Sequence, residues 1–296
     1  MKWAGGKSQL IEKLTRLFPP EILNGKIKKY VEPFIGGGAL FFNVAQNYPT
    51  IEEFFISDAN PELILAYTTI QKSVGELIDL LKEMEKNYHA LSGVEQKEFF
   101  YQKRKYFNSE LSIVNFSEFG DDWTERTASI IFLNHTCFNG LFRVNSKGEF
   151  NVPFGDYKNP KICDAENLLA VSNLLQRAEI QRGDFTLSVD FVDSNTFVYF
   201  DPPYRPISKT ASFNSYSKYD FNDLEQKRLA EYFASLSEKG AKLMLSNSDP
   251  KNEDADDHFF EDLYRGFHIE RVDASRMINS NGGKRGKIKE LVILNY

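Results

Sequence analysis

The chain has 296 residues, of which 42% are hydrophobic, so it can bury a sizeable core in one large domain or two smaller ones. Its formal net charge of −6 excludes a protein that binds nucleic acid through overall positive charge, although a local basic groove is compatible with this value. Its two cysteines, Cys137 and Cys163, indicate a reducing compartment without a disulfide framework. The sequence has no signal-peptide pattern and no apolar run of membrane-spanning length, so we expect a cytoplasmic protein that does not contact membranes.

The chain opens with a glycine-containing segment, which is followed by a predicted amphipathic helix at 9–17. Gly6-Lys7-Ser8 matches the end of a phosphate-binding loop, but Met1 stands where that loop requires its first glycine, and no strand precedes it. A nucleotide phosphatase is therefore not predicted. Trp3 and Lys7 suit a ligand with an aromatic part and a carboxylate, while a core tryptophan and a surface lysine are the simpler interpretation.

A predicted strand at 29–34 leads into the glycine-rich turn Phe34-Ile35-Gly36-Gly37-Gly38 and then into a helix at 39–47. Glycines in such a turn let a nucleoside ligand approach the backbone close to the helix amides. Dinucleotide enzymes share this feature, but their motif needs a third glycine, and Phe41 occupies that position when the motif is counted from Gly36.

Asp58 follows a predicted strand at 53–57 and lies about 20 residues after the glycines, the position from which a carboxylate holds ribose hydroxyls in related folds. The alternative role for Asp58 is that of N-cap for a helix starting at Pro61, for which Asn60 competes.

The pattern from 61 to 106 is helical, and a further helix is predicted at 124–136. The segment 137–155 then contains the turn signal Asn139-Gly140 and is interpreted as an irregular hairpin or long loop. Arg143 within it, flanked by asparagine, aromatic and small apolar residues, has the chemistry for reading base edges in a major groove, although a hairpin with one arginine is more often only a hairpin.

Phe197 to Phe200 has the composition of a buried strand, and Asp201-Pro202-Pro203-Tyr204 follows at its carboxyl end. The prolines end regular pairing, so a carboxylate, a rigid turn and an aromatic ring are presented at the edge where open α/β sheets bind ligands. This arrangement suits methylation of an exocyclic amino group on a base. Asp201 and the Pro202 carbonyl would accept the two N–H bonds and localise the nitrogen lone pair, and Tyr204 would stack on the extruded base.

The remaining elements complete an α/β pattern. We expect a polar loop at 205–219 beside the site, a helix capped by Asn222 that stops at Gly240, and a buried strand at 242–246. A helix at 257–265 and strands at 267–272 and 290–295 would complete the sheet. The segment 276–289 carries basic residues and no acid, so it is either a phosphate-backbone contact or a lysine-rich surface loop.

Together these motifs resemble the Dam-type DNA adenine-N6 methyltransferases of the α-group, in which the cofactor loop, the recognition region and the catalytic motif follow in this order. The resemblance covers nearly the whole chain, and it rests on the segments 2–7, 31–38, 57–60, 139–143, 150–155, 201–204 and 281–283. It implies a Rossmann-like, S-adenosylmethionine-dependent methyltransferase with a mostly parallel, seven-stranded sheet and an inserted, mainly helical target-recognition domain that carries a β-hairpin. The expected domains are 1–65 with 166–296 for catalysis and 66–165 for DNA recognition.

The resemblance also assigns roles to positions of this chain. It implies a catalytic motif of Asp201, Pro202, Pro203 and Tyr204, and contacts to S-adenosylmethionine by Trp3, Lys7, Phe34, Gly36, Gly38, Asp58, Asp184 and Asp201. Expected DNA contacts are Lys2, Phe138, Asn139, Leu141, Arg143, Asn145 and Pro153. Arg143 matches the guanine reader of a GATC-reading hairpin, and Phe138 matches an aromatic that fills the gap left by the adenine. Relatives usually have several residues before the position of Trp3, which here lies almost at the start.

We expect direct transfer of a methyl group to adenine N6 in duplex DNA, by a monomer, with a cognate restriction endonuclease as a further candidate partner. No metal site is expected, because the histidines are scattered. The alternatives are a cytosine-N4 methyltransferase, whose motif usually opens with serine or asparagine, and a non-catalytic DNA-binding relative. A nicotinamide oxidoreductase would leave Asp201-Pro202-Pro203-Tyr204 unexplained, and cytosine-C5 methylation would need a Pro-Cys nucleophile that neither cysteine provides.

Overall fold

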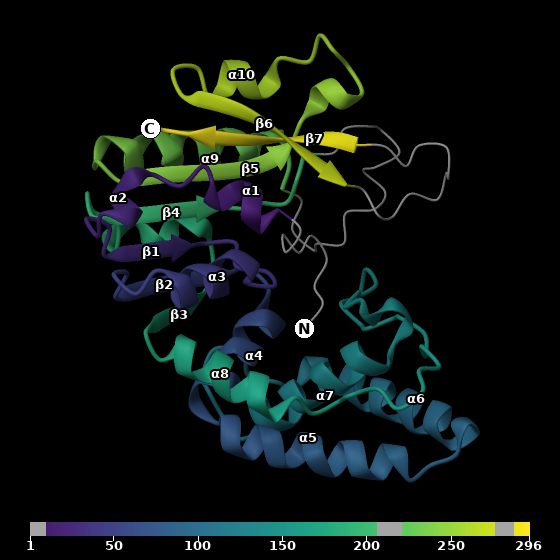
Figure 1. The fold of residues 1–296 in the computed structure, drawn as a ribbon. Helices are drawn as coiled ribbons and strands as arrows, with labels where there is room; N and C mark the ends of the chain where they lie inside the picture. The colour runs from purple at the N-terminus through teal and green to yellow at the C-terminus, as the bar shows by residue number, and fades with distance from the viewer. Residues whose placement is uncertain (1–9, 206–220, 276–286) are drawn as a thin grey trace. The chain divides into compact units, whose positions relative to one another are not determined.

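A computed structural model describes residues 10–205, 221–275 and 287–296 of the chain (Figure 1). Its α-helices are α1 (Ile11–Thr15), α2 (Pro20–Leu23), α3 (Ala39–Asn47), α4 (Pro61–Lys72), α5 (Val74–His89), α6 (Gly93–Ser109), α7 (Asp122–Thr136), α8 (Ala165–Leu175), α9 (Asp223–Glu238) and α10 (Phe259–Leu263). Its strands are β1 (Lys29–Glu32), β2 (Glu53–Asp58), β3 (Ala178–Arg182), β4 (Thr196–Phe200), β5 (Lys242–Ser248), β6 (His268–Ser275) and β7 (Lys287–Leu294).

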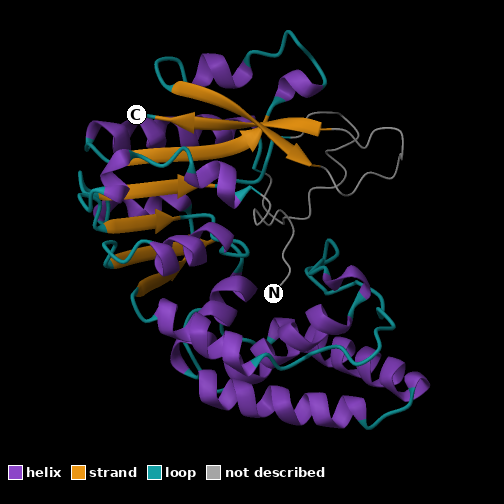
Figure 2. Ribbon diagram, in the orientation of Figure 1, coloured by secondary structure: helices purple, strands orange, loops and turns teal. Residues whose placement is uncertain are grey.

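The strands form one seven-stranded sheet in the order β3-β2-β1-β4-β5-β7-β6, drawn in orange in Figure 2. The pairs β1–β2, β1–β4 and β4–β5 are parallel, whereas β7 runs antiparallel to both β5 and β6. Mostly parallel pairing confirms the expected Rossmann-like α/β class. It also places the carboxyl ends of β1, β4 and β5 at one edge of the sheet.

The core on one face of the sheet consists of alternate residues of the central strands, because successive side chains of a strand point to opposite faces. Val198 and Phe200 of β4 belong to this cluster, as do Leu229 and Phe233 of α9. Phe197 lies on the opposite face, where its ring packs edge-on against that of Phe18 at 5.0 Å. Strand β4 is therefore buried on both faces, as the apolar and aromatic run from Phe197 to Phe200 predicts.

Several predicted elements shift at their ends for local reasons. Strand β1 stops at Glu32 and not at Phe34, because Pro33 has no amide hydrogen to continue a ladder. Helix α8 and strand β3, at 165–182, were not predicted as elements. The predicted N-cap at Asn222 is confirmed, because its side chain accepts hydrogen bonds from the Leu224 and Glu225 amides.

The chain divides into two compact units. Of the described residues, one unit contains 36–38 and 58–182, and the other contains 10–35, 39–57 and those from 183 onward. We call them the helical unit and the sheet unit. The compact units change at other residues than 65 and 165, since α8 and β3 group with the helical unit, and the expected division into a catalytic and a DNA-recognition domain stays a prediction.

A buried ion pair stabilises the helical unit. Arg126 of α7 is 1% exposed and donates two hydrogen bonds from Nε to the carboxylate of Glu62 on α4, at 2.9 and 3.1 Å. Its Nη1 also donates to the Phe107 carbonyl at 3.1 Å, and its guanidinium lies 4.1 Å from the centre of the Phe107 ring. These contacts join α4, α6 and α7.

None of the helices among the described residues is long and apolar enough to cross a membrane.

Candidate active site

The carboxyl end of β4 carries the motif that the sequence singles out. Strand β4 is central in the sheet and fully buried, and Asp201 follows its last residue directly. Pro202 is buried, Pro203 is exposed, and both Asp201 and Tyr204 are partly exposed. Because β4 is held by parallel partners on both sides, the position from which Asp201 leaves the sheet is fixed by the core.

A second carboxylate lies close to Asp201 in the sheet unit. Glu32, the last residue of β1, is 3% exposed and accepts a hydrogen bond of 2.5 Å from the Tyr30 hydroxyl. Burial raises the pKa of Glu32 well above its ordinary value, and the negative charge of Asp201 raises it further. The hydroxyl of Tyr199, which lies 2.9 Å from Ser246 Oγ, has a pKa raised by burial and then by Asp201.

The side chain of Tyr204 is held by a carboxylate on β7. Its hydroxyl donates a hydrogen bond of 2.7 Å to Oε2 of Glu290 on β7. Burial raises the pKa of Tyr204 well above its ordinary value, and the charges of Asp201 and Glu290 act in the same direction. The ring is therefore neutral at physiological pH, which suits a stacking surface for a base.

The glycine-rich turn is fastened by Asp58 within the helical unit. Asp58 Oδ2 accepts a hydrogen bond of 3.0 Å from the Gly36 amide, and its Oδ1 accepts one of 2.8 Å from the Asn60 amide. Gly36 and Gly38 have φ of 46° and 67°, a region that favours glycine. The N-cap of α4 is Asn60, whose side chain accepts from the Glu62 amide, so Asp58 is not needed for that role. Burial raises the pKa of Asp58 above its ordinary value.

Asp184 has an ion-pair partner in the sheet unit. Its carboxylate accepts hydrogen bonds of 2.9 and 2.6 Å from the two terminal nitrogens of Arg228. These bonds, together with those from Thr186, lower the pKa of Asp184 to about 2. The Arg228 guanidinium lies 4.2 Å from the centre of the Phe185 ring, which also packs against Phe34 at 5.5 Å. Asp184 and Phe34, both expected to bind the cofactor, thus belong to one cluster with Arg228 and Phe185.

The predicted recognition segment forms a short hairpin in the helical unit. Isolated bridges pair Val144 with Phe150 and Cys137 with Phe154, around a turn in which the Asn145 amide donates to the Glu149 carbonyl at 2.9 Å. The side chain of Asn145 is used within this turn, because it donates to Glu149 Oε2 at 2.8 Å and accepts from the amides of Lys147 and Glu149.

Two side chains of this hairpin present chemistry outward. Phe138 is 56% exposed, which is unusual for a phenylalanine beside a buried helix. Arg143 donates from Nε to Asn151 Oδ1 at 2.8 Å, and its terminal nitrogens have no hydrogen-bond partner in the described part of the chain. Of the other predicted DNA contacts, Asn139 and Pro153 are exposed and Leu141 is partly buried. Asn139 adopts φ of 60° at the start of the hairpin.

Some predicted site residues lie outside the described residues. They are Lys2, Trp3 and Lys7, most of the loop expected at 205–219, and most of the basic segment 276–289 with Asn281-Gly282-Gly283. Within the ranges that the structure describes, no cluster of histidine, cysteine, aspartate or glutamate side chains is arranged to hold a metal ion.

The comparison with known protein families matches residues 3–278 to the D12 class of N6 adenine-specific DNA methyltransferases. The chain belongs to this family. It is a DNA adenine-N6 methyltransferase, and its substrate class is DNA, as the resemblance of its motifs predicts.

Two relatives of known family support this assignment over nearly all of this sequence. The Type II methyltransferase M.MjaIII of Methanocaldococcus jannaschii is 48% identical over 100% of this chain and 98% of its own. The DNA adenine methylase of Haemophilus influenzae is 32% identical over 99% of this chain and 92% of its own. Among solved structures, an rRNA methyltransferase, aviRa, from Streptomyces viridochromogenes covers 97% of this chain and 83% of its own, with 10% identity and a TM-score of 0.38.

Several side chains around the Asp201-Pro202-Pro203-Tyr204 motif were not predicted. Glu32, Tyr30 and Glu290 surround Asp201 and Tyr204, although each lies in a different strand from the motif. Glu32 had a signal, since it is an acid that follows the buried residues Tyr30 and Val31 and directly precedes Pro33. Glu290 had none, because nothing in the local sequence relates it to a tyrosine 86 positions earlier.

Proposed function

We propose that this methyltransferase transfers a methyl group from S-adenosylmethionine to N6 of an adenine that is extruded from duplex DNA, within the sequence GATC. The observation that carries this proposal is the position of Asp201-Pro202-Pro203-Tyr204 directly after the buried central strand β4. There a carboxylate, a rigid turn and a neutral tyrosine ring are held together by the core.

The chemistry follows from the acceptors of this turn. The N6 lone pair of adenine is delocalised into the ring, so it is a poor nucleophile. Asp201 and the Pro202 carbonyl would accept one N–H bond each, which localises the lone pair and stabilises the positive charge that grows on nitrogen. No described residue donates a hydrogen bond to the Pro202 carbonyl, whereas the Pro203 carbonyl accepts one from Gln226 at 3.1 Å. In the described part of the chain, the Pro202 carbonyl is thus available to accept a hydrogen bond from the substrate.

The buried carboxyl group of Glu32 supports the same role for Asp201. Two carboxyl groups close together in a dry site do not both ionise readily, and it is the pKa of Glu32 that burial and Asp201 raise. A protonated Glu32 would leave the negative charge on Asp201, where an amino group that becomes positive needs it. The raised pKa of Glu32 thus favours its neutral form beside Asp201.

Residues of this chain fit S-adenosylmethionine, which supplies an electrophilic methyl group on a charged sulfur. The turn at Gly36 and Gly38 lets a ligand approach the backbone, and the carboxylate of Asp58 is already oriented by two amides. We assign Asp58 to the ribose hydroxyls and the cluster of Phe34 and Asp184 to the adenosine end. Trp3, Lys7 and Asp201 complete the proposed contacts.

The hairpin of the helical unit suits sequence reading in a major groove. Asn151 holds Nε of Arg143, so the terminal nitrogens are presented as a fixed fork, the geometry that recognises guanine O6 and N7. Exposed Phe138 would occupy the gap in the duplex, and Lys2, Asn139, Leu141, Asn145 and Pro153 would make further contacts. Extruding the adenine costs a few kcal/mol, which Tyr204 stacking and the acceptors at Asp201 and Pro202 would offset.

The decisive experiment removes the carboxylate of Asp201. Asp201→Ala should reduce methyl transfer by about 100- to 1,000-fold or more, because the developing charge loses its acceptor. Asp190→Ala, which removes an exposed carboxylate of the same unit, is the matched control and should keep full activity. Product is measured as N6-methyladenine by mass spectrometry, and methylated positions in plasmid DNA are sequenced to test GATC. Substantial residual methylation by folded Asp201→Ala would overturn the role of Asp201.

We further propose that the enzyme acts as a cytoplasmic monomer. A restriction endonuclease for the same sequence is the partner suggested by the name of the Type II methyltransferase M.MjaIII. Light scattering on the purified protein tests the monomer, and cleavage protection of plasmid DNA tests the pairing with an endonuclease.

A further inference from the structure

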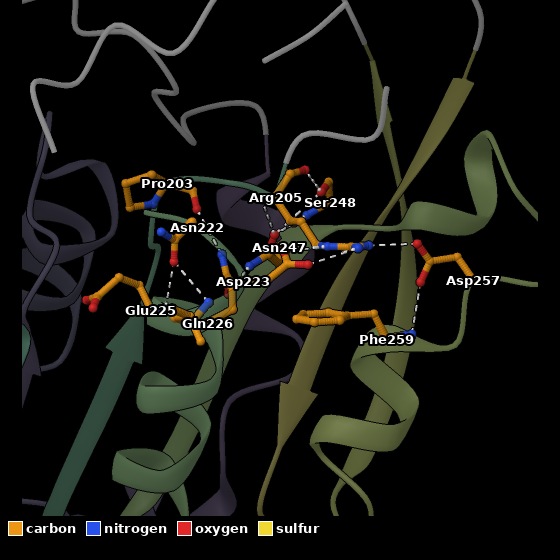
Figure 3. Close-up of polar contacts among 11 residues, drawn as sticks. Pro203, Arg205, Asn222, Asp223, Glu225, Gln226, Asn247, Ser248, Asp257 and Phe259 are labelled. Atoms are coloured by element: carbon orange, nitrogen blue, oxygen red, sulfur yellow. Dashed lines mark hydrogen bonds and ion pairs between the residues drawn. The ribbon is translucent and has the colours of Figure 1, made fainter. Parts of the chain in front are cut away.

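The loop that follows Asp201 is fastened on both sides of Tyr204 (Figure 3). Before it, the Pro203 carbonyl accepts a hydrogen bond of 3.1 Å from Nε2 of Gln226. After it, the Arg205 amide donates at 3.2 Å to Oδ1 of Asn247, and the Arg205 carbonyl accepts at 2.8 Å from Ser248 Oγ. These contacts come from α9 and β5, elements distant in sequence from the motif.

The two amide side chains are joined to each other. Nδ2 of Asn247 donates to Oε1 of Gln226 at 3.1 Å, and both residues are completely buried. Asn247 Oδ1 also accepts from the Ser248 amide at 2.9 Å. A buried amide is favourable only when its donors and acceptors are paired, and here the pairing is with the catalytic loop. Two apolar side chains would fill this space but could not donate a hydrogen bond to the Pro203 carbonyl.

The side chain of Arg205 holds the far end of the same loop. Its Nε donates to Asp223 at 2.8 Å and its Nη1 donates to Asp257 at 2.7 Å. The guanidinium lies 4.2 Å from the centre of the Phe259 ring. Two ion pairs and a stacked ring restrain this arginine strongly, so the residue after Tyr204 is fixed by its side chain as well as by its backbone.

Anchoring the Pro203 carbonyl also orients the Pro202 carbonyl. The Pro202–Pro203 peptide is planar, and the ring of Pro203 locks φ, so only ψ of Pro203 is free between the two carbonyl groups. The bond from Gln226 and the restraint at Arg205 remove that freedom. The direction of the Pro202 carbonyl is then set before any substrate binds.

We propose that Gln226 and Asn247 are positioning residues that preset the Pro202 carbonyl and Tyr204 for the adenine amino group. This inference rests on the proposed function of the motif. Neither residue touches the substrate; they act through the loop. Removing them should slow methyl transfer while DNA and cofactor binding persist, because an acceptor displaced by about 1 Å costs up to 100-fold in rate.

The test uses the full-length protein with two variants and one control. Gln226→Met keeps the volume of the side chain but removes its donor, and it should lower kcat by about 10- to 100-fold. KM for plasmid DNA and Kd for S-adenosylmethionine should stay within about threefold of the parent values, since uniform binding is untouched. Lys227→Met changes the exposed neighbour on α9 and should leave kcat unchanged. Thermal unfolding reports whether each variant is folded.

The pH dependence of Gln226→Glu activity distinguishes the loss of a hydrogen-bond donor from a packing defect. A protonated glutamic acid donates to the Pro203 carbonyl and accepts from Asn247 as glutamine does, whereas its carboxylate cannot donate. The activity of Gln226→Glu relative to the parent should therefore rise as pH is lowered from 8 to 6, while that of Gln226→Met should stay constant. If Gln226→Met does not fold, this pH profile decides the question.

Three results would overturn the inference. They are a kcat of Gln226→Met within about twofold of the parent, a pH-independent ratio for Gln226→Glu, and a loss of DNA binding as large as the loss of rate. An inactive Asp201→Ala combined with a fully active Gln226→Met would reject only this inference. An active Asp201→Ala would reject the proposed function itself, so the two failures are distinguishable.

Discussion

The hydroxyl of Tyr204 donates a hydrogen bond of 2.7 Å to Oε2 of Glu290, which lies 86 positions later in the chain. The bond links the end of the catalytic motif to β7, the strand that runs antiparallel to β5. A phenol that is tied to a carboxylate at its far end keeps its ring face in one orientation. The ring of Tyr204 is thus oriented by the antiparallel part of the sheet, while Asp201 is oriented by the parallel part.

This relationship predicts different effects for two substitutions of Tyr204. Tyr204→Phe retains the stacking face and loses only the bond to Glu290, so kcat should fall by less than about tenfold. Tyr204→Ala loses base stacking worth about 1–3 kcal/mol and should lose more. Single-turnover methylation of plasmid DNA measures both. Equal losses in the two variants would show that the ring face contributes nothing.

The raised pKa of Glu32 predicts how stability depends on pH. The folded protein holds the Glu32 proton above the ordinary pKa of 4.5, whereas the unfolded chain releases it there. This contribution to stability is complete below that value and is lost as pH rises through the folded pKa, at up to about 1.4 kcal/mol per pH unit. Glu32→Gln does not titrate, so its stability relative to the parent should increase from pH 5 to pH 8. Urea unfolding tests this, and a constant difference would contradict it.

Substitutions in the ion pair of Asp184 and Arg228 distinguish a role in stability from a role in cofactor binding. Both partners are about 40% exposed, at 41% and 40%, so the pair should contribute at most about 1 kcal/mol. Because the pKa of Asp184 is lowered to about 2, this contribution is present above 3.8 and fades as pH falls toward 2. Arg228→Met also removes the ion pair of Arg228 with Glu225, so at pH 7 it should destabilise the protein at least as much as Asp184→Asn does.

Only Asp184→Asn removes the carboxylate that we assign to the cofactor. Calorimetric titration should therefore show weaker binding of S-adenosylmethionine to Asp184→Asn, by about tenfold, and unchanged or tighter binding to Arg228→Met. Weakening by the same factor in both variants would assign Asp184 to the structure of the cluster and not to the ligand.

The proposed contact between the terminal nitrogens of Arg143 and a guanine predicts that removing this side chain weakens the preference for guanine. Arg143→Ala should reduce the preference for guanine at one position of the recognition sequence by about 1–3 kcal/mol, while methylation of other sites falls less. Lys147→Ala, at the exposed turn of the same hairpin, is the control and should lower affinity uniformly, if at all. Methylation rates on duplexes with a single base replaced would reveal the pattern. Unchanged discrimination in Arg143→Ala would exclude Arg143 as the guanine reader.

The sequence alone determined what depends on neighbouring residues. The run Phe197 to Phe200 identified the central strand to within one residue, because apolar and β-branched residues are favourable only where both faces are covered. Asn222 was identified as a helix cap from its spacing to the first helical turn, and Asn60 was named as a candidate cap in competition with Asp58. Both asparagines accept amide hydrogen bonds as N-caps. The family was identified by motifs whose order is itself a property of the sequence.

Only the tertiary structure decided which distant groups meet the motif. Glu32 and Glu290 reach Asp201 and Tyr204 from β1 and β7, and Gln226 and Asn247 reach Pro203 and Arg205 from α9 and β5. Apart from the acid of Glu32 before Pro33, their local sequence patterns carry no mark of that destination. The physical reason is the sheet, in which the carboxyl ends of the parallel strands and the start of antiparallel β7 meet at one edge. Local patterns specify an element, whereas burial and hydrogen bonding between elements specify the catalytic geometry.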